Sequence, residues 1–244
     1  MLLYLSWPQA PWEFWRWIIL LIPLEIFAML LYVVSIRDAP LSETLPYLSF
    51  TPVFSILTGW IMLDEQISLK GGIGIVLVCL GAYLLNLEKG KKSTKFNWLT
   101  PMKVMFTRKE SRYMVLVAFI YSITSVVSKA TLLYVKPMHF AAFYFVILGF
   151  TVLVVTLIVK PKAVAVLKIN MRPNILVSGL ISIMVVTHFL AISKIEVAYM
   201  IAVKRLSLLF GILYGAYLFH ESGLSKNILA VVLMIAGTIV ILAT

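Results

Sequence analysis

Five ionisable side chains stand inside long apolar stretches of this sequence: Glu25, Lys129, His188, Lys204 and Arg205. A charged residue at the centre of a membrane helix costs about 2.5–3.5 kcal/mol on insertion scales, so such residues tend to face a cavity or one another. With a rise of about 1.5 Å per residue, all five would lie about 8–12 Å below the same membrane surface. We expect them to line one polar cavity, in which the carboxylate of Glu25 offsets part of the positive charge.

A structural role is the alternative for these residues. Lys129 is close enough to its helix end for the amine to reach the membrane interface. Adjacent helical residues point about 100° apart, so Lys204 and Arg205 cannot both face one cavity squarely. One of them would then contact a solute, and the other would be a structural partner for Glu25 or Glu196.

The signatures of an intramembrane enzyme are missing from the sequence. His220-Glu221 lacks the second histidine of a His-Glu-x-x-His zinc motif. There is no Gly-x-Ser-x-Gly turn and no pair of membrane-embedded aspartates. His188, taken alone, is more often a hydrogen-bonded core residue than a proton relay. We therefore predict no enzymatic activity, and we assign no catalytic residue, no metal ligand and no cofactor.

The composition is that of a membrane protein. The 244 residues are 62% hydrophobic and only 13% charged, with a mean hydropathy of +1.02, whereas soluble domains are nearer to half apolar. Apolar runs of about 20 residues suit a bilayer core about 30 Å thick. We predict an all-α polytopic protein with eight spans, at 17–35, 39–63, 69–87, 113–134, 139–159, 174–194, 197–219 and 224–243.

An internal repeat relates the second and third spans to the last two. The copies begin five crossings apart, so they would run through the membrane in opposite directions, as in many secondary transporters. Small residues and a helix-ending glutamate recur in one register, at a shift of 156 residues: Gly59 with Gly215, Glu65 with Glu221, Gly74 with Ala230 and Gly81 with Gly237.

These recurring residues suggest two structural roles. The small residues at 74, 81, 230 and 237 lie seven apart on one face of each helix and would let two backbones approach closely. The glutamates at 65 and 221 and the glycines at 59 and 215 lie at or near helix ends. We interpret them as residues that shape the turn before the next helix rather than as solute contacts.

The repeat resembles the EamA-type transporters of the drug/metabolite transporter superfamily. The resemblance implies ten helices in two repeats of five, so this chain would lack the first two. Residues 1–87 would then be a partial first repeat of three helices, 88–112 a basic linker, and 113–244 a complete second repeat of five. The residues that carry the resemblance are Pro46, Thr51-Pro52-Val53-Phe54, Gly59, Glu65, Gly71, Gly81, Lys129, Pro137, Ala202-Val203-Lys204-Arg205-Leu206-Ser207, Phe210, Gly215, His220-Glu221 and Gly237.

The resemblance implies an integral membrane carrier that moves a small organic solute or metabolite by alternating access. The excess of basic groups in the predicted cavity favours an anionic or zwitterionic solute. The alternative is a non-transporting fragment, or an assembly partner that borrows the missing helices from another chain.

Loop charges bear on orientation and partners. The loops on the side holding both termini contain 4 lysines and arginines, and those on the other side contain 14. The positive-inside rule places the second side in the cytoplasm, whereas the family resemblance implies a cytoplasmic C-terminus. We attribute the net charge of +11 to topology and lipid headgroup contact rather than to nucleic acid. We expect a multi-pass protein of the cell membrane whose partners are the lipid bilayer and a small-molecule solute, with a homodimer as an assembly to test.

Overall fold

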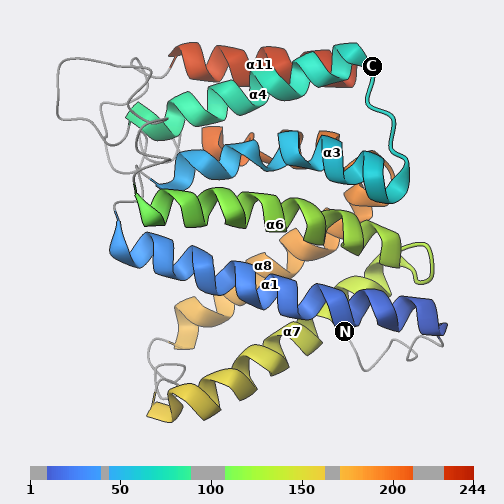
Figure 1. Ribbon diagram of the computed structural model, residues 1–244, viewed down its shortest axis with the longest axis vertical. Helices are drawn as coiled ribbons and strands as arrows, with labels where there is room; N and C mark the ends of the chain where they lie inside the picture. The colour runs from blue at the N-terminus through green and yellow to red at the C-terminus, as the bar shows by residue number, and fades with distance from the viewer. Residues whose placement is uncertain (1–9, 40–43, 89–107, 163–170, 211–227) are drawn as a thin grey trace. The chain divides into compact units, whose positions relative to one another are not determined.

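The computed structural model describes residues 10–39, 44–88, 108–162, 171–210 and 228–244, and the regular structure in these ranges is helical (Figure 1). The elements are α1 (Trp12–Asp38), the 3₁₀ helix η2 (Leu45–Phe50), α3 (Thr51–Leu63), α4 (Leu69–Glu88), α6 (Lys109–Thr131), α7 (Pro137–Val159), α8 (Met171–Ile192), α9 (Val197–Lys204) and α11 (Ile228–Leu242).

Each of the eight predicted spans overlaps one of these helical segments, with η2 and α3 together in the second span. The span at 197–219 overlaps α9, and its residues 211–219 lie outside the described residues. In the described ranges, five segments are long and apolar enough to cross a membrane: α1, η2 with α3, α6, α7 and α8. Shorter apolar helices cover Leu69–Leu84 and Ile228–Leu242. The predicted all-α polytopic membrane fold is confirmed.

The chain forms two compact units, which we describe separately. Unit 1 comprises Met1–Ile26 and Val127–Ile195, and unit 2 comprises Phe27–Val126 and Glu196–Thr244. Helices α1 and α6 each contribute residues to both units. This division follows spatial contacts, whereas the division into 1–87, 88–112 and 113–244 follows the repeat in the sequence and stays a prediction.

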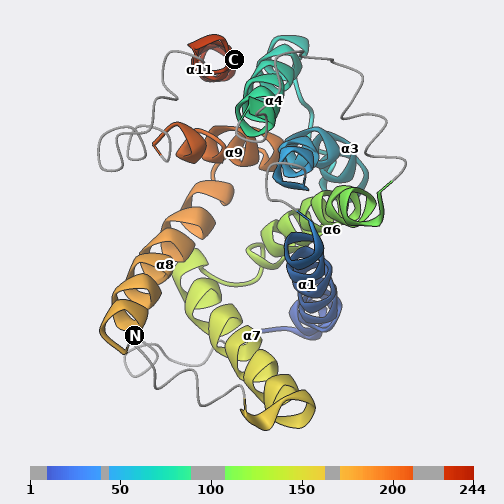
Figure 2. The same ribbon diagram turned by 90° about the vertical axis from the view of Figure 1, so that its left-hand side faces the viewer.

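In unit 2, α4 and α11 lie side by side with their backbones in contact (Figures 1 and 2). A Cβ atom added to Gly74 would lie 2.7 Å from the carbonyl oxygen of Gly237, and one added to Gly81 would lie 2.6 Å from that of Ala230. The order of these contacts shows that the two helices are antiparallel. At a shift of 156 residues, Gly74 corresponds to Ala230 and Gly81 corresponds to Gly237. Each glycine of α4 therefore contacts the residue that corresponds to the other glycine, as a two-fold axis between the two copies would produce. The predicted close approach is confirmed.

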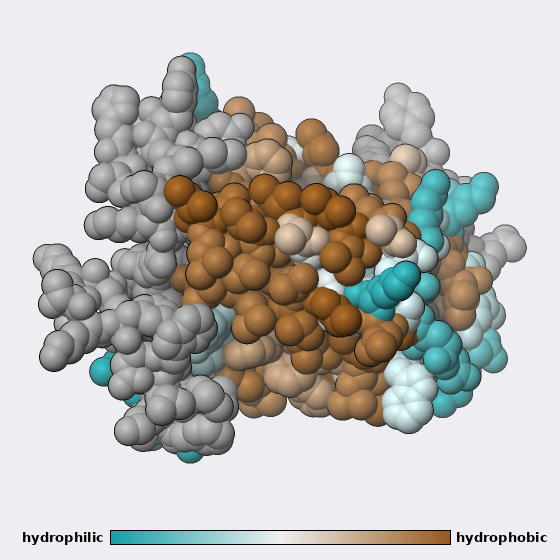
Figure 3. All heavy atoms as spheres, turned by 90° about the horizontal axis from the view of Figure 1, so that it is seen from above, coloured by the Kyte–Doolittle hydropathy of each residue, from teal (hydrophilic) through white to brown (hydrophobic). Residues whose placement is uncertain are grey.

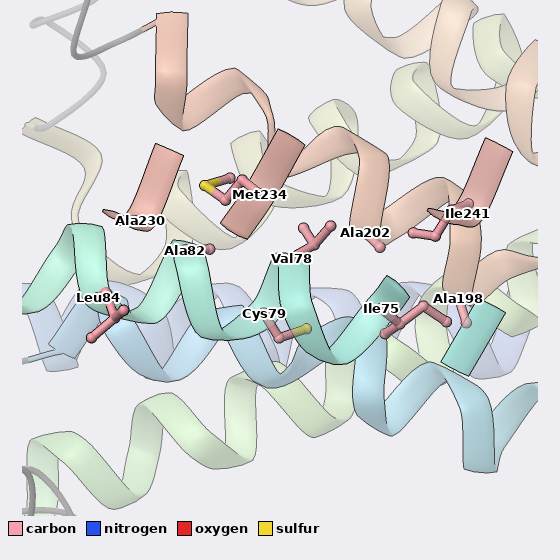
Figure 4. Packing of buried hydrophobic residues seen from close by; sticks show 10 residues of the cluster. All are labelled: Ile75, Val78, Cys79, Ala82, Leu84, Ala198, Ala202, Ala230, Met234 and Ile241. Atoms are coloured by element: carbon pink, nitrogen blue, oxygen red, sulfur yellow. The ribbon is translucent and has the colours of Figure 1, made fainter. Parts of the chain in front are cut away.

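The core of unit 2 lies around α4. Figure 4 shows Val78 and Ala82 of α4 facing Met234 of α11, all three of them fully buried. Two fully buried alanines of α9, Ala198 and Ala202, belong to the same cluster. Small side chains on α9 leave room for α4 to approach, so the helices of the two repeat copies share one core.

The outer face of α4 and α11 is apolar, as a lipid-facing surface requires. Figure 3 shows this face with apolar side chains across its middle and polar ones gathered towards one edge. The exposed side chains include Val76 and Leu80 of α4 and Val232, Ile235 and Ile239 of α11. Water-soluble monomers rarely expose so many apolar side chains together, and this surface fits the bilayer.

In unit 1, α7 and α8 lie beside one another (Figure 2) and are joined to the start of α1 by aromatic side chains. The ring of Phe140 on α7 lies 4.8 Å from that of Phe189 on α8 and 6.4 Å from that of Phe14 on α1, in edge-to-face geometry. All three rings are buried. This cluster holds in place the helices that carry His188 and Glu25.

Candidate functional site

Both copies of the repeat contain an interrupted helix in unit 2. In the first copy, the 3₁₀ helix η2 gives way to α3 at Phe50–Thr51, with Pro46 and Pro52 at the starts of the two segments. In the second copy, α9 ends at Lys204, and residues 205, 206, 208 and 209 donate hydrogen bonds from their backbone N–H groups to the carbonyls three residues earlier. The register of the repeat places these interruptions at equivalent positions. Interrupted helices are where membrane transporters commonly place their binding sites.

The side chain of Arg205 joins the two interruptions. Its Nη2 donates to the carbonyl oxygen of Leu48 at 2.6 Å and to Oγ1 of Thr51 at 3.0 Å. Pro52 has no N–H to donate to Leu48, as an α-helical residue four positions along would. The carbonyl of Leu48 accepts from the backbone N–H of Thr51, as in a 3₁₀ turn, and also from the hydroxyl of Thr51 and from Arg205.

The guanidinium of Arg205 keeps unused donor capacity. Its Nε is buried and has no hydrogen-bond partner among the described residues. In the described part of the chain, the hydrogen bonds of Arg205 go to Leu48 and Thr51, which are neutral. A structural partnership of Lys204 or Arg205 with Glu25 or Glu196 stays a prediction. A guanidinium with neutral partners and a buried, unused N–H can accept an anionic group as a further ligand.

Lys204 differs from its neighbour in exposure. Lys204 is exposed and Arg205 is half-buried. Two adjacent residues at the end of α9 are expected to point in different directions. Of this pair, Arg205 is therefore the residue that the fold holds inside unit 2.

The three other ionisable candidates belong to unit 1 and are half-buried. Lys129, in the last turn of α6, donates from Nζ to the carbonyl oxygen of Ile195 at 2.7 Å, which ties the end of α6 to the segment after α8. Glu25 lies on α1, two residues after Pro23. The ring of His188 on α8 lies 5.1 Å from that of Phe189. A single cavity shared by all five candidates would span both units, and it stays a prediction.

Glu65 lies at a helix end, as expected, but its carboxylate reaches the other copy of the repeat. Asp64 ends α3 in the left-handed conformation with φ 54°, which a short polar residue tolerates. Oε2 of Glu65 then accepts from the backbone N–H of Val197 at 2.9 Å, at the start of α9. A Cβ atom on Gly59 would lie only 2.7 Å from that oxygen, so the glycine makes room for the carboxylate. The counterparts Glu221 and Gly215 lie outside the described residues.

The sequence did not predict the two groups that accept hydrogen bonds from Arg205, the carbonyl of Leu48 and the hydroxyl of Thr51. Thr51 and the main chain of Leu48 gave no signal as polar partners, because one is a threonine in an apolar run and the other contributes only a carbonyl. The signal that could have found them is the pair Pro46 and Pro52, since prolines six residues apart in an apolar run mark helix starts and hence a break in the helix between them. In the ranges described, no group of three or more His, Cys, Asp or Glu side chains could hold a metal ion.

Sequence comparison identifies the class to which this arrangement belongs. The sequence model of the EamA-like transporter family matches residues 1–87 and 110–243. The chain belongs to the EamA-like transporter family. The resemblance predicted from the repeat is thereby confirmed, and the protein is a multi-pass membrane protein of a transporter family.

One curated relative of this EamA-like chain and one solved structure of similar fold are informative. A subunit from Enterobacter sp. (strain 638), described as the probable 4-amino-4-deoxy-L-arabinose-phosphoundecaprenol flippase subunit ArnE, is 34% identical over 71 residues. The match covers 29% of this chain and 66% of the relative, just under two thirds of its length. A solved crystal structure superposes with a TM-score of 0.68 at 17% identity, covering 99% of this chain and 81% of that one. The second likeness shows the fold alone.

Proposed function

We propose that this EamA-like chain is a secondary carrier for a small organic solute with an anionic group, and that Arg205 binds that group. The observation that carries the proposal is the guanidinium at the junction of two interrupted helices, with a buried Nε that has no partner. Charged donors form hydrogen bonds to anions about twice as strong as neutral ones, so this group is the best-placed anion ligand in unit 2.

The helix interruptions supply the rest of the proposed site. The 3₁₀ segments at Leu45–Phe50 and after Lys204 leave backbone groups outside regular α-helical bonding. Carriers use such groups to bind polar parts of a solute at the middle of the membrane. The interruptions occur at equivalent positions of two inverted copies, and rocking of one copy against the other would expose the site to each side in turn.

A second candidate function follows from the curated relative. ArnE is described as a flippase subunit for a sugar linked through phosphate to a polyprenol. A phosphate-linked lipid also carries an anionic group that Arg205 could bind. In this alternative the chain works as one subunit of a flippase in the inner membrane of a bacterium, and the solute is the head of a lipid.

Counterflow in proteoliposomes tests the proposal, with amino acids, nucleosides, organic anions and a polyprenyl-phosphate sugar as solutes. We expect wild-type protein to exchange a solute with an anionic group. Arg205→Gln should reduce that exchange about tenfold or more, as expected for a charged hydrogen bond worth about 1.5–3 kcal/mol.

Two matched variants complete this experiment. Lys194→Gln removes an exposed positive charge from the segment after α8 and should exchange at the wild-type rate. Arg205→Lys keeps the charge but loses the forked geometry and should retain partial exchange. Wild-type exchange by Arg205→Gln, with normal expression and monodisperse protein, would contradict the proposal.

A further inference from the structure

Unit 1 contains a hollow of about 300 Å³ that the proposed function does not use. Its walls are Glu13, Arg16, Trp17 and Leu20 from the first turns of α1, and Tyr134 from the segment after α6. Four of these five side chains carry a charge or a polar group attached to an aromatic ring. The hollow is therefore amphipathic, unlike the apolar face that α4 and α11 present.

The two charges in this hollow do not neutralise one another. Glu13 and Arg16 are both exposed, and no ion pair between them exists in the structure. They stand three residues apart on one face of α1, so their Cβ atoms lie about 5–6 Å apart. A carboxylate and a guanidinium at that spacing suit a ligand that carries an ammonium and an anionic group on a short link.

Polarity falls along the hollow from one end to the other. Leu20 lies seven residues after Glu13, or about 10 Å further along the helix axis. Leu20 is 44% exposed, so its side chain can contact a chain lying beside the helix. The charged end lies among the aromatic residues Trp12, Trp15 and Trp17, which are typical of the headgroup level of a membrane. This order of charge, aromatic ring and aliphatic side chain matches an amphiphile standing upright in one leaflet.

We infer that this hollow binds a phospholipid with a zwitterionic, primary-amine headgroup. Arg16 binds the phosphate and Glu13 accepts hydrogen bonds from the ammonium, while the first part of an acyl chain lies against Trp17 and Leu20. A primary ammonium can donate to Glu13 and to the hydroxyl of Tyr134, which a quaternary ammonium cannot. An anionic headgroup without an amine would leave Glu13 unpaired beside a second negative charge. The site is independent of the solute site at Arg205.

Native mass spectrometry of the purified full chain tests this site. The protein is exchanged into phosphatidylethanolamine, phosphatidylcholine and phosphatidylglycerol with identical acyl chains. We expect wild-type protein to retain phosphatidylethanolamine preferentially. Arg16→Gln and Glu13→Gln should each lower that retention about threefold, the size expected for one exposed charge contact.

The control variant is Lys136→Gln, which removes an exposed charge next to α7 and outside the hollow. It should retain phosphatidylethanolamine as the wild type does. Glu13→Gln should also move the preference towards phosphatidylglycerol, a change that partial unfolding would not produce. Equal retention of the three lipids by wild-type protein, or unchanged retention in both variants, would overturn the inference.

A soluble headgroup separates a lipid site from a solute site. Glycerophosphoethanolamine carries the same charges without acyl chains. It should fail to displace the lipid at equal concentration, because the contact with Leu20 is then lost. Displacement by the soluble headgroup would overturn the assignment to a lipid.

Discussion

The two copies of the repeat meet in two ways within unit 2. Between α4 and α11 they meet through Gly74, Gly81 and Gly237, with backbone against backbone. Between η2–α3 and α9 they meet through Arg205, whose guanidinium lies between two interrupted helices. The same duplication thus produced one close, apolar contact and one polar contact with unused donors. We infer that the first holds the two copies together and that the second provides for binding.

The largest effect should come from enlarging a residue at the glycine contact. In Gly81→Leu, a Cβ atom would lie 2.6 Å from the carbonyl oxygen of Ala230, and the rest of the side chain has no space. Overpacking of this kind costs about 1–3 kcal/mol or more, so we expect most of the protein to be lost as a monodisperse species.

Size-exclusion profiles and thermal midpoints measure this effect. Gly72→Leu on the same helix is the control, because nothing lies within 4 Å of a Cβ atom there. If both leucine variants had the same midpoint, α4 and α11 would not be packed as described.

Pro52→Ala should have a smaller effect, and one that separates stability from transport. The new N–H can compete with Arg205 for the carbonyl of Leu48, which also accepts from the N–H and the hydroxyl of Thr51. A regained hydrogen bond contributes about 0.5–1.5 kcal/mol, so the thermal midpoint should hold or rise while solute exchange falls. Counterflow and thermal unfolding of the same preparation measure both quantities. Faster exchange in Pro52→Ala would show that the interruption in the first copy is not needed.

The helix spans could be predicted from the sequence, but the contacts of Arg205 could not. The lengths of the apolar segments predicted the spans, and the spacing of Gly74 and Gly81 predicted a close approach of backbones, because small side chains are what such an approach requires. The partners of Arg205 could not be predicted in the same way. They are a carbonyl and a hydroxyl 154–157 residues away, and only the folded chain brings them together.

The smallest effect concerns the helix-end contact of Glu65. In Glu65→Gln, the bond to the N–H of Val197 can persist, but the negative charge at the start of α9 is lost. Charges at helix ends contribute about 0.3–1 kcal/mol, so we expect a slightly lower thermal midpoint and unchanged solute affinity. Glu65→Ala should lower the midpoint further, because the N–H then loses its acceptor. A tenfold loss of affinity in Glu65→Gln would instead assign Glu65 to the solute site.

The central claim is that Arg205 recognises the anionic group of the solute. Its most direct test compares transport of the solute found by counterflow with transport of its neutral amide analogue, in wild-type protein, Arg205→Gln and Lys204→Gln. We predict that wild-type protein and Lys204→Gln prefer the anion about tenfold or more, the size of one charged hydrogen bond, and that Arg205→Gln shows no preference. An undiminished preference for the anion in Arg205→Gln would contradict the account.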